Sequence, residues 1–93
     1  MKYTIRYSNR FEKSLRLCHK RGLSIPKLTK VLELLAESGT LPRQYKPHKL
    51  KNIPGNMTWE CHIEPNWLLV WEQNDMMLTL LMLDTGTHAD LFK

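Results

Sequence analysis

Residues 58–71 read Thr58-Trp59-Glu60-Cys61-His62-Ile63-Glu64-Pro65-Asn66-Trp67-Leu68-Leu69-Val70-Trp71, and the architecture of the whole chain can be worked out from them. Apolar and polar residues alternate over the first half, which is the period of a strand with one buried face. Trp59, Cys61 and Ile63 then share the apolar face, and His62 lies on the polar face. Glu64-Pro65-Asn66 is typical of a turn, and the almost continuously apolar residues 67–71 are typical of a central strand.

The segments on either side supply the rest of a sheet. Downstream, Asn74-Asp75 predicts a hairpin turn onto another apolar strand at residues 76–83. Upstream, a short strand near residues 50–53 ends at the turn sequence Pro54-Gly55-Asn56. The alternating residues 2–7 predict one more strand at the start of the chain.

Two amphipathic helices are expected between the first strand and the others. Ser8 can cap a helix that runs to about Arg21, and Ser24 and Gly39 bound a second helix. We therefore predict an α+β fold of order β-α-α-β-β-β-β, with a mostly antiparallel sheet and both helices packed on one face. Residues 1–93 would form a single domain. The other face of the sheet would be free for polar residues.

Charge divides the chain into a basic and an acidic half. Residues 1–51 hold thirteen lysines and arginines against three acids, a net charge of +10. Residues 52–93 hold one lysine against six acids, a net charge of −5. A basic half can face a polyanion such as a nucleic acid, and it can equally reflect lysines that solvate two helices.

Three of the four histidines, His48, His62 and His88, lie in the second half of the chain. Imidazole is the side chain that titrates nearest neutral pH, so histidines on one surface suggest proton transfer. His48 belongs to residues 40–49, which we predict to be a loop where basic residues accompany Tyr45. Such a loop can hold phosphates and stack a base.

The sequence disfavours a membrane or secreted location, and it disfavours a metal site. There is no run of eighteen apolar residues and no signal-peptide pattern, and Cys18 and Cys61 lack the spacing of a disulfide framework, so a cytoplasmic location without membrane contact is expected. A metal site could use His48, Cys61, His62 and His88. However, Cys61 and His62 are neighbours on a strand and point to opposite faces, so we predict no metal and no cofactor.

Three motifs together resemble the YafQ branch of the RelE-type toxins. They are Tyr45-Lys46-Pro47-His48-Lys49-Leu50, then His62-Ile63-Glu64-Pro65-Asn66-Trp67-Leu68-Leu69-Val70-Trp71, and finally Thr85-Gly86-Thr87-His88-Ala89-Asp90-Leu91-Phe92. The resemblance implies the toxin of a type II toxin–antitoxin system, a ribosome-dependent endoribonuclease that cuts messenger RNA. It also implies a cognate antitoxin, the 70S ribosome and mRNA as partners, and operator DNA only through the antitoxin complex.

Carried over by position, the resemblance assigns catalytic roles to His48, His62, Asn66, His88 and Phe92. The basic residues expected to contact RNA or the ribosome are Arg10, Lys13, Lys20, Arg43, Lys46, Lys49 and Lys51. The chain departs from the family pattern at Asn66, where an aspartate is usual, and at Trp59, where a basic residue is common. An amide cannot exchange a proton near neutral pH, so we expect Asn66 to lower the activity. Trp59 faces the apolar side and is expected in the core.

The chemistry suits these residues without a metal. RNA cleavage needs a base for the ribose 2′-hydroxyl, an acid for the leaving 5′-oxygen and positive charge near the phosphorane. Histidines can supply the base and the acid, and a third histidine, or Lys46 or Lys49, can supply the charge. The sequence does not say which histidine is base and which is acid. Two alternatives remain at this point: a toxin-fold module that binds antitoxin or ribosome without cleaving, favoured by Asn66, and a DNA-binding protein, favoured only by charge.

Overall fold

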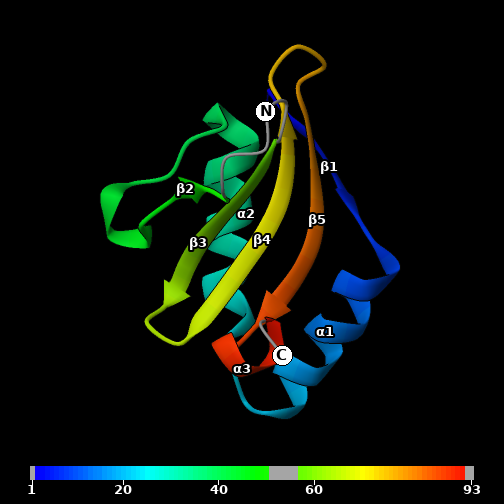
Figure 1. Ribbon diagram of the computed structural model, residues 1–93, viewed down its shortest axis with the longest axis vertical. Helices are drawn as coiled ribbons and strands as arrows, with labels where there is room; N and C mark the ends of the chain where they lie inside the picture. The colour runs from blue at the N-terminus through cyan, green and yellow to red at the C-terminus, as the bar shows by residue number, and fades with distance from the viewer. Residues whose placement is uncertain (1, 51–56, 92–93) are drawn as a thin grey trace.

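The structure is a computed structural model that describes residues 2–50 and 57–91. Along the chain it contains β1 (Thr4–Tyr7), α1 (Asn9–Lys20), α2 (Ile25–Ser38), the 3-10 helix η1 (Arg43–Tyr45), β2 (His48–Lys49), β3 (Thr58–Glu64), β4 (Trp67–Asn74), β5 (Thr79–Gly86) and α3 (His88–Leu91) (Figure 1). The predicted order of helices and strands is confirmed.

The strands form one sheet in the order β1-β5-β4-β3-β2. The pairs β2–β3, β3–β4 and β4–β5 are antiparallel, whereas β1 lies parallel to β5. The predicted mostly antiparallel sheet is therefore confirmed. β4 is the central strand, which explains why residues 67–71 are almost continuously apolar.

Both helices pack on the same face of the sheet, with α1 against β5 and α2 against β3 (Figure 1). Apolar residues from the helices and from alternating sheet positions join in one core, which includes Phe11, Cys18, Leu28, Val31, Leu35, Cys61, Ile63, Trp67, Leu69, Trp71, Leu80 and Met82. Because strand side chains alternate between faces, Glu60 and His62 lie on the face opposite the helices.

The helices begin at the predicted serines, but only Ser8 caps its helix through the side chain. The Ser8 hydroxyl accepts a hydrogen bond from the Phe11 amide at 2.9 Å, and it donates to the Leu83 carbonyl at 2.9 Å. Gly39 ends α2 in the left-handed conformation with φ 71°. A Cβ on Gly39 would lie 2.6 Å from the Tyr3 ring, so glycine is needed there for both reasons.

Ser8→Ala is expected to lower the free energy of unfolding by about 1–2 kcal/mol, because the first turn of α1 loses its side-chain acceptor. That loss corresponds to a melting temperature lower by roughly 4–15 °C for a domain of this size. Ser24→Ala is a matched control, because Ser24 precedes α2 without a side-chain capping hydrogen bond. Urea unfolding of both variants measures the difference, and equal losses would contradict the role given to Ser8.

Two predicted boundaries are wrong. The strand predicted at residues 76–83 begins at Thr79 and continues to Gly86. The Asn74 side chain accepts hydrogen bonds from the amides of Met76 and Met77, so these apolar residues form an exposed turn instead of a strand. Met76 is 94% exposed.

The loop predicted at residues 40–49 contains more structure than its sequence indicates. It includes η1 and β2, and β2 carries His48. The strand predicted near residues 50–53 and the turn Pro54-Gly55-Asn56 lie outside the described residues, except for Leu50, whose amide donates to the Thr58 carbonyl at 2.9 Å. Within the described part of the chain, no helix is long and apolar enough to cross a membrane.

Candidate active site

His48 faces a buried carboxylate across two antiparallel strands. It pairs in register with Glu60 of β3, and its Nε2 lies 3.2 Å from Glu60 Oε1. Glu60 is only 6% exposed, and its second oxygen, Oε2, is buried without a hydrogen-bond partner among the described residues. His48 Nε2 therefore faces a carboxylate oxygen that can accept its hydrogen bond.

His62 lies two residues beyond Glu60 on β3, on the same face of that strand. Its ring centroid is 5.9 Å from the ring centroid of His88, with the ring planes inclined by 51°. His62 Nδ1 lies 3.3 Å from the Pro65 carbonyl oxygen. A carbonyl can only accept, so this contact keeps the proton on Nδ1 and leaves Nε2 available.

Asn66, in the turn between β3 and β4, approaches the other side of His88. Its side-chain oxygen lies 3.4 Å from His88 Nδ1. The oxygen accepts from Nδ1, which directs the proton of a neutral His88 to that nitrogen and leaves Nε2 for other partners. Asn66 is thus placed to orient His88, although it cannot exchange a proton with it.

The register of the sheet explains why residues far apart in sequence meet. His48 lies opposite Glu60, so it is a diagonal neighbour of His62, at roughly 7–8 Å. His62 pairs with Leu68, Leu68 pairs with Gly86, and α3 begins with His88 two residues later. Figure 1 shows the β3–β4 turn and α3 at the same end of the sheet. We call the surface formed by His48, Glu60, His62, Asn66 and His88 the histidine face.

The basic residues predicted on α1 lie away from the histidine face, since α1 packs against the opposite side of the sheet. Lys13 and Lys20 are exposed on this helix. Arg10 Nε donates to Asp84 Oδ2 at 2.9 Å, yet its side chain remains 74% exposed. These residues can therefore contact a large partner such as an RNA, but at a different surface from the histidines.

The basic residues in and around η1 are exposed, and one of them contacts an aromatic ring. Arg43 and Lys46 are exposed in η1 and just after it. Lys49 Nζ lies 5.9 Å from the centroid of the Trp59 ring, on the face of β2 that points away from His48. Trp59 itself stacks on Trp71 at the edge of the core, as predicted. Lys51 and the predicted catalytic residue Phe92 lie outside the described residues.

Cys61 is separated from the histidine face by the strand itself. It is fully buried in the core, and this burial raises the pKa of its thiol to about 12. A thiol held neutral inside the core cannot join His62 in binding a metal, because the two side chains point to opposite faces.

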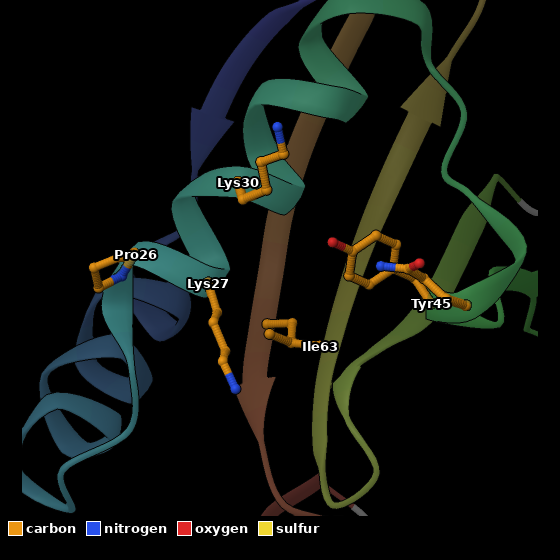
Figure 2. Close-up of a pocket in the computed structure, with 6 residues that line it drawn as sticks. Pro26, Lys27, Lys30, Tyr45 and Ile63 are labelled. Atoms are coloured by element: carbon orange, nitrogen blue, oxygen red, sulfur yellow. The ribbon is translucent and has the colours of Figure 1, made fainter.

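A hollow of about 430 Å³ lies between α2 and η1. Figure 2 shows Lys27 and Lys30 of α2 across from Tyr45. Ile63, a core-facing residue of β3, also lines it, so the hollow is on the helix side of the sheet. Lys27 also pairs with Glu64 at 2.5 Å. The hollow is therefore separate from the histidine face.

Glu60 is the residue of the histidine face that the sequence analysis missed. The alternation of residues 58–63 already placed Glu60 on the polar side of the strand, the side that also carries His62. An acidic residue at such a position is usually solvated. Only the pairing of β2 with β3 shows that Glu60 is buried beside an imidazole.

Comparisons with known proteins agree with this fold. The model of the family described as "Bacterial toxin of type II toxin-antitoxin system, YafQ" matches residues 3–93. The mRNA interferase toxin YafQ of Escherichia coli strain B / BL21-DE3 is 36% identical over 95% of this chain and 94% of its own length.

Solved structures of the same fold cover nearly the entire chain. One is the E. coli DinJ-YafQ complex, with a TM-score of 0.88 and 35% identity over 98% of this chain and 99% of that one. Another is a metal-bound toxin from Helicobacter pylori, with a TM-score of 0.85 and 36% identity over 97% of this chain and 99% of that one. The resemblance inferred from the three motifs is confirmed, and the chain belongs to the YafQ family of bacterial toxins of type II toxin–antitoxin systems.

Proposed function

We propose that this toxin is an endoribonuclease that cuts messenger RNA on the ribosome, with the histidine face as its active site. The observation that carries the proposal is the arrangement of three imidazoles on one face, one paired with Glu60 and another oriented by Asn66. The E. coli relative is named an mRNA interferase, which supports the same substrate here.

The geometry suggests a role for each histidine. His48 Nε2 donates to Glu60, so its other nitrogen, Nδ1, which lies 3.4 Å from the Lys49 carbonyl oxygen, takes the proton from the ribose 2′-hydroxyl as its oxygen attacks the adjacent phosphorus. The bond from phosphorus to the 5′-oxygen breaks, and that oxygen receives a proton from His88. His62 lies between them and, in its protonated form, donates from Nε2 to the phosphorane and stabilises its charge. The products are a 2′,3′-cyclic phosphate and a 5′-hydroxyl.

The test is message cleavage in a purified translation system, mapped by primer extension. We expect cuts inside codons of translated message and their loss with His62→Ala. A chelator selective for transition metals, which leaves Mg²⁺ for the ribosome, should not change the rate, because no step above uses a metal ion. Cleavage that requires added zinc or copper would contradict this mechanism, and the metal-bound relative makes the control necessary.

Asn66→Asp is expected to raise the cleavage rate about tenfold, at the lower end of general acid–base effects. A carboxylate at the position of the amide, 3.4 Å from His88 Nδ1, favours the protonated ring that serves as the acid. The activity should also persist to higher pH, since the acid keeps its proton longer. Cleavage rates of both proteins between pH 6 and 9 measure this, and an unchanged profile would show that Asn66 does not attenuate the enzyme.

The second candidate is a module that binds antitoxin or ribosome without cleaving RNA, and Asn66 is the feature that favours it. If this chain does not cleave the message and Asn66→Asp does, the result would select this alternative.

The partners belong to the proposal as well. The E. coli relative is seen in complex with DinJ, which supports a cognate antitoxin for this chain. We further propose the 70S ribosome and mRNA as partners, contact with operator DNA only through the antitoxin complex, and a cytoplasmic location. The exposed cations Lys13, Lys20, Arg43 and Lys46 are available for the nucleic acid or for acidic segments of the antitoxin.

A further inference from the structure

The short helix α3 carries His88, yet it has little apolar burial to hold it in place. None of its four residues, His88–Leu91, is fully buried, and Leu91 is its only partly buried apolar residue. A single helical turn is also far too short to be stable by itself. The position of His88 must therefore depend on other contacts of α3 with the rest of the fold.

Asp90 supplies these contacts on two sides. Its Oδ2 accepts hydrogen bonds from the Thr87 amide at 2.9 Å and from Arg21 at 2.6 Å. In return, the Asp90 amide donates to the Thr87 hydroxyl at 3.2 Å, which completes a reciprocal cap around His88. Arg21 is the C-cap residue of α1. One carboxylate thus closes the turn that holds His88 and ties it to the end of the first helix.

The backbone before His88 is shaped to admit this carboxylate. A Cβ on Gly86 would lie 2.8 Å from Asp90 Oδ2 and 2.9 Å from Asp90 Cβ, closer than real side chains approach. Any other residue at this position would displace Asp90 or the end of β5. A polar hollow of about 180 Å³, lined by Asp84, Asp90 and Arg10 among others, lies beside α1 here, so the junction is not packed by apolar side chains alone.

The ion pair is stable over the range in which imidazoles titrate. The hydrogen bond from Arg21, and then that from the Thr87 amide, lower the pKa of Asp90 to about 2. Asp90 therefore stays ionised while a histidine gains or loses a proton near neutrality. The contact can hold His88 equally well in both of its protonation states.

We propose that Asp90 and Arg21 are positioning residues for His88, acting as a clamp between α3 and α1. The inference rests on the proposed catalytic role of His88. It gives Asp90, two residues after the histidine, a role that is separate from the reaction itself.

Asp90→Ala is expected to lower the single-turnover cleavage rate about 10- to 100-fold without changing the toxin concentration that gives half the maximal rate, because a misplaced group loses reactivity while substrate binding is retained. Arg21→Met removes one exposed ion pair and should lower the rate up to about fivefold. Arg21→Lys should restore most of the loss. The control is Lys27→Met, which removes an ion pair of similar length between α2 and β3 and should have no effect.

A second readout separates the clamp from the catalytic role. Nuclear Overhauser contacts between the rings of His62 and His88 should be present in the free toxin and in Lys27→Met, and they should weaken in Arg21→Met and disappear in Asp90→Ala. The contact between Trp59 and Trp71 serves as the folding check. If Asp90→Ala does not fold, Arg21→Met and Arg21→Lys provide the same comparison.

Retained contacts between the two histidines together with lost cleavage would overturn the clamp. Lost contacts with unchanged cleavage would instead overturn the catalytic role of His88, and with it the proposed mechanism, while leaving the clamp as a structural fact. We expect Asp90→Ala to lose both the contacts between the two histidines and the cleavage. We expect Arg21→Lys to recover both relative to Arg21→Met.

Discussion

His88→Ala is expected to lower message cleavage about 10²- to 10⁴-fold, because it removes the proposed acid for the leaving 5′-oxygen. His88 is exposed, so its removal leaves no cavity in the core and should hardly change stability. The measurement is single-turnover cleavage on a programmed ribosome, followed by primer extension. The loss should appear in the rate constant more than in the toxin concentration for half-maximal rate.

His19→Ala is the matched control for this experiment. His19 is also an exposed histidine, but it lies on α1, away from the histidine face. Equal activity of the two variants would remove His88 from the mechanism. A large loss with His88→Ala alone would show that the effect belongs to the site and not to the loss of any surface imidazole.

Replacing Glu60 is expected to change activity and stability in opposite directions. Glu60→Gln keeps the shape of the side chain but removes its charge, so His48 loses the group that stabilises its protonated form. We expect cleavage to fall about 10²-fold. Glu60→Leu should raise the free energy of unfolding by about 1 kcal/mol, because a buried oxygen without a hydrogen-bond partner in the described structure is replaced by an apolar group.

The two effects together distinguish a functional carboxylate from a structural one. If Glu60 served only to hold β2 against β3, its replacement would lower the free energy of unfolding of the protein. Urea unfolding and single-turnover cleavage, measured on the same preparations, make the comparison. Destabilisation by Glu60→Leu with unchanged cleavage by Glu60→Gln would contradict the role we give to this residue, since both results oppose it.

Much of the fold could be predicted because local patterns and tertiary structure agree here. The alternation of Trp59, Cys61 and Ile63 correctly placed one face of β3 in the core, and Ser8 and Gly39 correctly bounded the helices. The prediction failed where a side chain competes with the backbone pattern. The Asn74 side chain accepts hydrogen bonds from the amides of Met76 and Met77, so β5 begins later in the sequence than predicted.

The candidate site was predicted less completely, for a physical reason. Periodicity tells which face a residue occupies, but not which strand lies beside it. His62 could therefore be placed on the polar face, whereas the contact of His88 with Asn66 and the burial of Glu60 depend on the pairing between strands. For the same reason the contact of Asp90 with Arg21 could not be predicted from the sequence.

The parallel pairing of β1 with β5 has a consequence for how the toxin is made. β1 ends at Tyr7, and the strand beside it ends at Gly86, so the sheet cannot close until nearly ninety residues have been synthesised and have left the ribosome. Such long-range pairing is slow to form. His88 and its attachment to α1 come later still along the chain. On the proposed mechanism, which needs His88, a ribosome that translates this message therefore carries an incomplete active site for most of elongation.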